Sequence, residues 1–247
     1  MLIDTHCHLE FAEFAKDREK IVEDCLAKDI LLVNSLVDLK QVEDFLAFSK
    51  SYEGLYVTIG CGPVDITDER FELAVDLIRK HRPEIVGLGE VGLDYYWVKD
   101  EKKHEQQRVY FQKFISLSKE LDLPLVVHSR ESEEDAVRIL EENELPAMLH
   151  CYSGSVELAK KAIKLGCLIS IPTSIAYSNP KKELVRQLPL ESIVLESDAP
   201  FLAPTPKTRN TPANIELSCE KIAEIKEVKK EEVEKATTES AKKFFGI

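Results

Sequence analysis

The sequence predicts an α/β fold, a (β/α)8 TIM barrel with extra C-terminal helices, and three observations support this prediction. Eight short apolar segments alternate with charged segments of helical periodicity. The apolar segments are rich in Val, Ile and Leu, which is typical of parallel strands that helices cover on both faces. The chain has 247 residues, a length close to that of a typical eightfold barrel. We therefore expect a single domain that covers residues 1–247.

The elements follow one another in a regular order along the chain. Strands are predicted at residues 2–5, 30–33, 55–59, 85–88, 123–127, 147–149, 167–171 and 193–195. Helices are predicted between them at residues 18–28, 40–50, 68–81, 105–121, 133–143, 156–165 and 180–188. Four prolines between positions 200 and 212 interrupt regular structure after the eighth strand. Two further helices, at 213–226 and 230–245, are expected to pack outside the barrel.

The composition argues against several classes of protein. With 33 Lys and Arg against 45 Asp and Glu, the net charge is −12, so any contact with nucleic acid must be local. No apolar run approaches the roughly 20 residues of a membrane span, and no secretory signal is visible, so we expect a cytoplasmic protein without membrane contact. The six cysteines are scattered and are expected to be reduced thiols. No obligate protein partner is indicated.

Polar residues that can bind metals recur at the carboxyl ends of the predicted strands. They are His6, His8, Glu90, His128, His150 and Asp198. Because the carboxyl ends of parallel barrel strands open on one face, these side chains are expected to converge there. A single histidine is usually structural, but four at strand ends favour a metal site. The other two histidines, His81 and His104, lie among charged neighbours and are assigned to the surface.

The spacing of the first two histidines is informative. His6 and His8 are two residues apart, which matches the side-chain period of a strand, so both imidazoles point to the same side. Cys7 points to the other side and is interpreted as a small buried side chain. Both histidines can therefore reach the same metal ion.

Two carboxylates complete the candidate site. Glu90 lies in the glycine-rich segment 87–92, which leaves its carboxylate at the mouth of the strand. A structural alternative is an ion pair with Arg130, but the nearby imidazoles favour a metal, and a carboxylate can bridge two ions about 3.5–4 Å apart. Asp198 ends the eighth strand before Pro200, where an aspartate can also serve as a turn former. We interpret Glu90 and Asp198 as metal ligands and as the catalytic residues.

These segments together resemble the TatD family of metal-dependent deoxyribonucleases, in the amidohydrolase-like barrel superfamily. The resemblance runs along the whole chain, through segments 4–9, 89–96, 123–130, 150–154, 195–200 and 209–212. It implies cleavage of DNA, often from an end, by an enzyme with two divalent metal ions that share Glu90. His6, His8 and Asp198 would complete the first site, and His128 and His150 the second. The resemblance implies Mg²⁺ or Mn²⁺, whereas an imidazole-rich site suits Zn²⁺, Fe²⁺ or Mn²⁺ better, so the identity of the metal stays open.

One segment departs from the family pattern. The family commonly has Gly-x-His-Pro-His after the third strand, whereas this chain has Gly-Cys-Gly-Pro-Val at residues 60–64. Two histidines that could contact a phosphate group are therefore replaced by Gly62 and Val64. This departure affects the expected substrate, because the candidate metal ligands are all retained.

The resemblance and the residues suggest a mechanism. We expect the two metal ions to lower the pKa of a shared water, so that the resulting hydroxide attacks phosphorus in line. Asp198 would orient this water and accept its proton. Arg130 and Arg209 could hold phosphate oxygens, because a guanidinium matches phosphate geometry. The aromatic segment that begins at Tyr95 could stack on nucleobases.

Two other hypotheses remain open from the sequence. The same metal pair could hydrolyse a small phosphoester, lactone or amide, because a fold does not determine its substrate, and the missing histidines and acidic composition favour this alternative. A substrate panel distinguishes it from a nuclease. An inactive binding scaffold is the third hypothesis, against which the complete ligand set speaks. Bound metal and stabilisation by Mn²⁺ or Zn²⁺ would argue against a scaffold.

Overall fold

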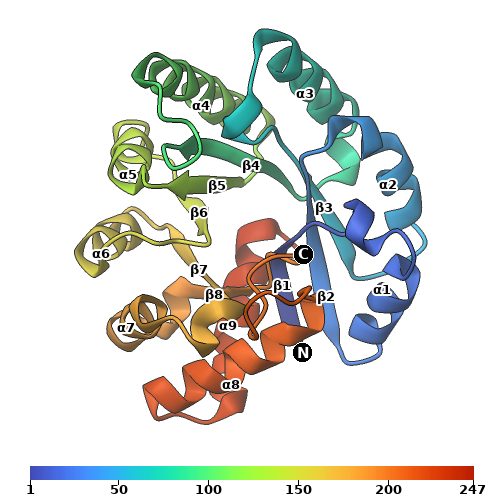
Figure 1. The fold of residues 1–247 in the computed structure, drawn as a ribbon, viewed down its shortest axis with the longest axis vertical. Coiled ribbons are helices and arrows are strands. Elements are labelled where there is room, and N and C mark those ends of the chain that lie inside the picture. Colours follow the sequence, from blue (N-terminus) through green and yellow to red (C-terminus); the bar gives the residue numbers. More distant parts are fainter.

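The chain folds into a parallel barrel whose eight strands follow sequence order (Figure 1). The computed structural model describes residues 1–247. The strands are β1 (Leu2–Cys7), β2 (Ile30–Leu36), β3 (Leu55–Ile59), β4 (Gly87–Asp94), β5 (Leu125–Arg130), β6 (Ala147–His150), β7 (Leu168–Pro172) and β8 (Ile193–Glu196). Each strand pairs in parallel with the next. The predicted (β/α)8 barrel is therefore confirmed.

The barrel closes between its last and first strands through the segment that follows β8. The backbone N–H of Asp198 donates to the carbonyl of His6 at 2.9 Å, and the N–H of His8 donates to the carbonyl of Ala199 at 2.8 Å. Lower in the barrel, the hydroxyl of Thr5 donates to the carbonyl of Leu195 at 2.9 Å. These bonds fix His6 in β1 and His8 just after it next to Asp198.

A ring of helices surrounds the strands (Figure 1). They are α1 (Arg18–Leu26), α2 (Val42–Ser49), α3 (Asp68–Lys80), α4 (Glu101–Leu121), α5 (Glu133–Glu142), α6 (Val156–Lys164) and α7 (Asn179–Gln187). Several of them begin at a short polar side chain that accepts a hydrogen bond from a backbone N–H of the first turn. Thr67 accepts such a bond from Arg70, and Ser155 accepts one from Leu158. Short 3-10 turns lie at Ala12–Phe14, Leu39–Gln41, Pro63–Asp65, Arg82–Glu84, Thr173–Ala176, Leu190–Ser192 and Pro212–Asn214.

Strand β4 differs most from its predicted position. The sequence predicts a strand at residues 85–88, but the strand runs from Gly87 to Asp94 because its pairing with β5 resumes at Val91 and continues to Asp94. The pairing register shifts between Leu88 and Val91, which is the segment that carries Glu90. Gly92 has a φ of 140°, and a Cβ added to it would lie 2.1 Å from the carbonyl oxygen of His128. A residue with a side chain therefore cannot replace Gly92 without moving β4 away from β5.

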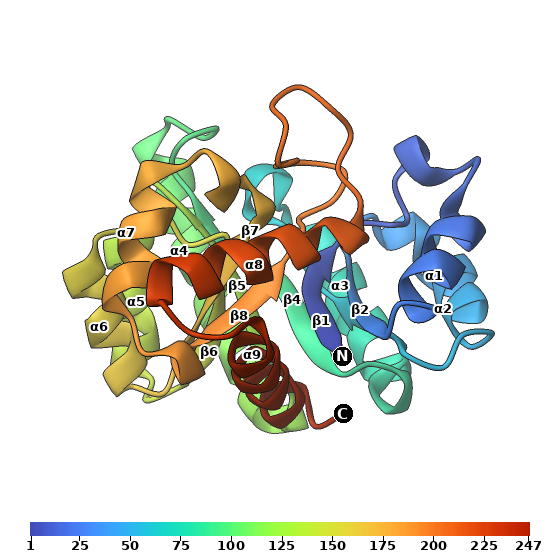
Figure 2. The same ribbon diagram turned by 90° about the horizontal axis from the view of Figure 1, so that it is seen from below.

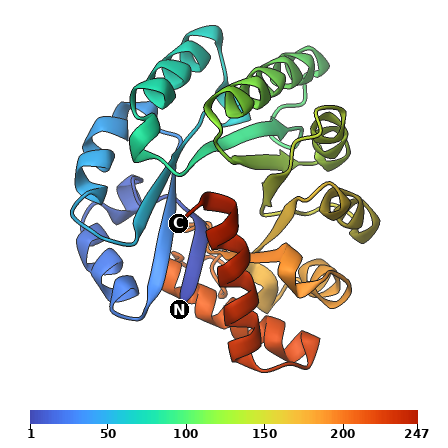
Figure 3. The ribbon, with the colours of Figure 1, turned by 180° about the vertical axis from the view of Figure 1, so that it is seen from behind.

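The sequence predicts the position of only one of the two extra helices correctly. Helix α8 (Ile215–Lys226) packs beside α7 and α9 on the outside of the barrel. Helix α9 (Lys230–Phe245) lies across the amino end of the strands, as Figure 3 shows from behind. Its buried side chains pack against inward-facing residues of five strands: Ile3, Val33, Val126, Met148 and Val194 against Ala241 and Phe245. The prediction that both helices pack outside the barrel is thus corrected for α9, which covers one end.

The opposite end of the barrel is the open one. The long connection between β8 and α8 projects from this carboxyl end, on the far side of the barrel from α9 (Figure 2). All six cysteines are unpaired, as predicted. No helix is long and apolar enough to span a membrane. The single-domain organisation and the cytoplasmic location stay predictions.

Candidate metal centre

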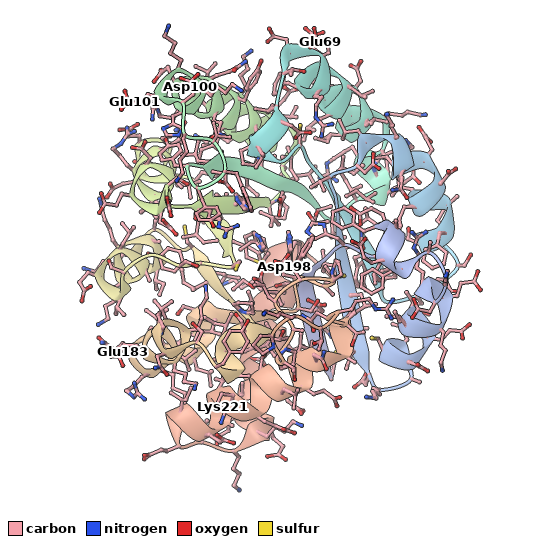
Figure 4. The ribbon with its side chains drawn as sticks, viewed as in Figure 1. Glu69, Asp100, Glu101, Glu183, Asp198 and Lys221 are labelled. Carbon is pink, nitrogen blue, oxygen red and sulfur yellow. The ribbon has the colours of Figure 1, made fainter.

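The six predicted metal ligands come from five strand ends. His6 and His8 lie at the end of β1, Glu90 lies in β4, His128 in β5, His150 ends β6, and Asp198 lies two residues beyond β8. Figure 4 shows Asp198 at the centre of the barrel mouth, whereas the labelled Glu69, Glu183 and Lys221 lie on outer helices. Sequence separation does not keep these residues apart, because the parallel topology brings the strand ends to one face.

One tight group consists of His6, His8 and Asp198. The Nε2 atoms of His6 and His8 are 3.1 Å apart. Oδ1 of Asp198 lies 3.8 Å from Nε2 of His6 and 3.5 Å from Nε2 of His8. All three ligand atoms lie within 4.8 Å of one another. Two ring nitrogens directed at each other beside a carboxylate need a proton or a cation between them, so this donor set fits a divalent metal ion.

A second tight group forms around Glu90. Its Oε2 atom lies 3.1 Å from Nε2 of His6 and 3.5 Å from Nε2 of His150. Its Oε1 atom faces the other way, 3.9 Å from Nδ1 of His128. Glu90 thus contacts both groups, and His128 lies at the edge of the cluster. The two tight groups share His6, whereas the resemblance implied Glu90 as the shared ligand.

The second ring nitrogen of both His8 and His150 is held by a hydrogen-bond partner. Nδ1 of His8 lies 2.9 Å from the carbonyl of Ser35, and Nδ1 of His150 lies 3.1 Å from Oε2 of Glu196. Such partners fix the orientation and the protonated nitrogen of a ligating imidazole. In contrast, Nδ1 of His6 is buried without a partner.

The carboxylates behind these histidines were not among the predicted site residues. Asp94 lies 2.9 Å from Nε2 of His128, and Glu196 contacts His150. Both are fully buried. A partial signal was present in the sequence, because Asp94 follows Glu90 closely and Glu196 precedes Asp198 closely at the ends of predicted strands.

The electrostatics of the cluster keep its carboxylates ionised. Burial alone would raise the pKa of Glu90, but the hydrogen bond to His6 and the nearby His128 and His150 hold it well below its usual value. Burial also opposes the ionisation of Asp198, but the hydrogen bond to His8 and the nearby imidazoles of His150 and His6 together outweigh it, so the pKa of Asp198 is lowered. A metal binds the ionised form of a carboxylate, so both groups are prepared for a cation.

A cleft of about 680 Å³ opens above the cluster. Five of the six predicted ligands line it, all except His6, and its lining also includes the aromatic side chains of Phe11, Trp97 and Phe201. Trp97 is 64% exposed and Phe201 49% exposed, which is unusual for large apolar side chains and leaves them free to contact a ligand. The cleft therefore combines imidazoles and carboxylates that could hold a metal with exposed aromatic side chains.

Arg130 lies in this cleft, as expected for a predicted substrate-binding residue. It is exposed at the end of β5, and its guanidinium lies 3.8 Å from the centre of the Tyr96 ring and 5.5 Å from that of Trp97. Stacking on an aromatic ring holds a guanidinium in place while its N–H groups stay free. Arg130 thus presents a positioned cation at the side of the metal cluster.

Tyr95, predicted as a substrate contact, lies outside the cleft. Its hydroxyl donates to Oδ2 of Asp135 at 2.7 Å and accepts from Arg108 at 2.9 Å. Its ring stacks on His104, with ring centres 3.8 Å apart. The side chain is therefore engaged between α4 and α5, and we do not retain it as a substrate contact.

Arg209, also predicted as a substrate contact, is likewise engaged elsewhere. Both of its terminal nitrogens donate to the carboxylate of Asp17, at 3.0 and 2.5 Å, and one of them also donates to the carbonyl of Glu13. It ties the loop after β8 to the segment before α1 and does not line the cleft. We do not retain it as a substrate contact.

The prediction that His81 lies at the surface is wrong. Its side chain is 7% exposed, and its ring nitrogens lie 2.8 Å from Glu84 and 3.0 Å from Glu43. Carboxylates from α2 and from the turn after α3 enclose it, which explains how a histidine among charged residues can be buried. His104 is half-buried against Tyr95.

Lys181 is a further residue of the cleft that was not predicted. Although it is a lysine, it is only 6% exposed. Its Nζ donates to the carbonyl of Cys151 at 2.9 Å, to that of Tyr152, and to the hydroxyl of Ser153 at 3.0 Å. The ammonium group is therefore saturated by the loop that follows His150 and supports that loop.

A parallel barrel that gathers imidazoles and carboxylates at its open carboxyl mouth has the architecture of a metal-dependent barrel enzyme. The family model described as TatD related DNase matches residues 3–246. The chain is 39% identical to the uncharacterized metal-dependent hydrolase MJ1582 of Methanocaldococcus jannaschii, over 98% of this chain and 96% of that protein. It is 33% identical to deoxyribonuclease TATDN3 of Homo sapiens, over 99% of this chain and 94% of that protein.

A solved structure agrees with these sequence relationships. The crystal structure of YjjV, a TatD homologue from Escherichia coli K12, matches with a TM-score of 0.91 and 25% identity, over 100% of this chain and 98% of that one. The chain therefore belongs to the TatD family and is a metal-dependent hydrolase.

Proposed function

We propose that this hydrolase cleaves phosphodiester bonds in DNA, as a TatD-like deoxyribonuclease that acts from an end. The observation that carries this proposal is the position of Glu90, whose two oxygens face His6 and His150 on one side and His128 on the other. A carboxylate between two sets of imidazoles suits a pair of metal ions, the arrangement that many nucleases use. The name of the human relative, deoxyribonuclease TATDN3, supports DNA as the substrate.

We assign the metals to the residues as follows. Both ions would share Glu90: His6, His8 and Asp198 would complete the first site, and His128 and His150 the second. When bound, the ions supply Lewis acidity, which polarises the phosphorus–oxygen bonds and makes a water molecule more acidic. The mixed imidazole and carboxylate donors suit Mn²⁺ and Zn²⁺, and Mg²⁺ less well.

The protein's own side chains orient the water and bind the substrate. The Asp198 carboxylate is ionised and 14% exposed to the cleft, where it orients the attacking water and accepts its proton. Arg130 binds phosphate oxygens with the guanidinium that Tyr96 holds in place. Trp97 and Phe201 offer faces on which nucleobases stack. These contacts are local, which is consistent with a net charge of −12.

The test is cleavage of end-labelled single-stranded and duplex DNA by metal-loaded protein. Asp198→Asn is expected to lower kcat by about 10²–10⁴, because it removes the proton acceptor. Asp76→Asn, at an exposed position of α3, is the matched control and is expected to retain full activity. Equal cleavage by the Asp198→Asn variant and the unmodified protein would contradict the proposed role of Asp198.

A second candidate function is hydrolysis of a small phosphoester, lactone or amide. The acidic composition and the absence of side chains that bind phosphate at Gly62 and Val64 favour it. A panel of small esters, lactones and amides separates the two functions. Rapid turnover of a small substrate together with no cleavage of DNA would establish the second candidate and reject the first.

A further inference from the structure

A second, smaller cavity adjoins the metal cleft. Its volume is about 350 Å³, and it shares Phe11, Val37, Glu90 and His128 with the larger cleft. The segment 62–65 and the first turn of α3 form its other side. The metal ligands Glu90 and His128 therefore lie at the boundary of two cavities, and a ligand bound to the metals can extend into both.

Arg70 provides the cation of the smaller cavity. It lies in the first turn of α3 and lines the cavity with a side chain that is 37% exposed. Its Nη1 atom lies 3.5 Å from Oδ2 of Asp65, but that carboxylate is 66% exposed, so water competes for the pair. The Nε atom of Arg70 is buried and has no hydrogen-bond partner. The partly exposed terminal nitrogens are therefore the donors that a ligand can reach.

Asp38, a second of the three carboxylates that line this cavity, does not neutralise Arg70. Oδ1 of Asp38 accepts from the N–H of Lys40 at 3.1 Å, and Oδ2 accepts from Gln41 at 3.0 Å. Both oxygens therefore cap the turn before α2. Arg70 is the one arginine or lysine among the residues that line the cavity, so it is the side chain there that can bind an anion.

The cavity lies beside the segment that departs from the family pattern. A Cβ added to Gly62 would lie 3.6 Å from Oε1 of Glu90, so this glycine borders the metal cluster directly. Glu90 and Arg70 therefore line the same cavity, and Gly62 contributes no side chain to it.

We propose that Arg70 binds a second anionic group of the substrate, a phosphate next to the one that is cleaved. Arg130 and Arg70 then lie in different cavities that meet at Glu90 and His128, so a chain with successive phosphates can contact both while its scissile phosphate reaches the metals. Lys181 cannot take this role, because backbone carbonyls and a hydroxyl occupy its ammonium group. The inference rests on the proposed function and specifies its substrate: a phosphodiester with a neighbouring phosphate.

The test compares two nucleotides that differ by one phosphate. Binding of thymidine 3′,5′-bisphosphate and thymidine 5′-monophosphate to the Mn²⁺-loaded protein is measured by titration calorimetry. The unmodified protein is expected to prefer the bisphosphate by about tenfold, and Arg70→Gln to lose most of this preference with little change for the monophosphate. Arg79→Gln, on the same helix but paired with Glu120 at the surface, is the control and keeps the preference.

Three results would overturn the inference. The unmodified protein could bind both nucleotides equally well, or Arg70→Gln could lose the same affinity for both. In the third result, Asp65→Asn would lose the preference for the bisphosphate. The last variant frees Arg70 from its carboxylate, so the preference is expected to stay or to grow. Its loss would show that the pair only holds segment 62–65 in place. The measurement does not depend on DNA cleavage. A preference that requires Arg70, in a protein that leaves DNA intact, would support the inference and reject the nuclease.

Discussion

Nδ1 of His150 lies 3.1 Å from Oε2 of Glu196, and this pair is buried behind the metal cluster. Burial opposes a charge on the imidazole, but the carboxylate of Glu196 outweighs it and raises the pKa of His150 to about 9. The other oxygen of Glu196 has no hydrogen-bond partner. His150 is therefore the hydrogen-bond partner of this carboxylate, and the opposite ring nitrogen of His150 faces Glu90.

Replacement of Glu196 is expected to weaken metal binding without abolishing the fold. Glu196→Gln keeps an oxygen that can accept from His150 but removes the charge, so the affinity for Mn²⁺ should fall about 10- to 100-fold. Titration calorimetry of the metal-free protein with Mn²⁺ measures this change. Glu191→Gln, at an exposed position just before β8, is the control. Unchanged affinity in Glu196→Gln would show that the pair does not support the metal site.

The contact between β4 and β5 makes a prediction about stability. Gly92→Ala should reduce the free energy of unfolding by about 3 kcal/mol or more, because the added Cβ would lie 2.1 Å from the carbonyl of His128 at a φ of 140°. Gly246 also has a positive φ, 70°, but nothing lies within 4 Å of its Cβ position. Gly246→Ala should cost only about 1 kcal/mol. Urea denaturation measures both, and equal effects would contradict the proposed crowding at Gly92.

The network around Asp135 makes a prediction about pH. Burial opposes the ionisation of Asp135, but hydrogen bonds from Tyr95 and Arg138 hold the pKa of its carboxyl below 3.8. A depressed pKa stabilises the fold above the pKa of the unfolded chain, and this stabilisation is lost as the pH falls through the folded pKa. Asp135→Asn should therefore lower stability by about 1 kcal/mol at pH 7.

The pH dependence separates this effect from a simple loss of packing. The difference between Asp135→Asn and the unmodified protein should persist down to about pH 5 and shrink below pH 3.8. Urea denaturation at several pH values measures it, with Glu134→Gln at the exposed neighbouring position as the control. A difference that stays constant below pH 3.8 would rule out the electrostatic explanation.

The sequence patterns predict the barrel correctly, but they do not predict where every element ends or packs. Runs of Val, Ile and Leu reveal buried strands because both faces of such strands are apolar. The end of β4 was not predicted, because its glycines and Glu90 resemble a turn and only pairing with β5 shows the strand continuing. Helix α9 was placed outside the barrel, because periodicity shows which face of a helix is buried and not which end of the barrel covers it.

The sequence also predicts the candidate site only in part. Ligand-type residues at strand ends could be placed together, because topology alone brings them to one face. Partners from distant elements could not be predicted, and they explain the differences at Tyr95, engaged by Asp135, and at Arg209, engaged by Asp17. Arg70 gave no signal in the sequence, because a charged residue in the first turn of a helix normally faces solvent.

The most direct test of the proposed metal centre is the amount of Mn²⁺ that the protein holds after equilibrium dialysis, measured by elemental analysis. The unmodified protein should bind about two ions per chain, and Glu90→Ala should bind less than one, because Glu90 contacts His6, His128 and His150. Glu69→Ala, at an exposed position of α3, should bind as much as the unmodified protein. No bound Mn²⁺ in the unmodified protein, or equal binding by Glu90→Ala, would contradict a dinuclear centre built around Glu90.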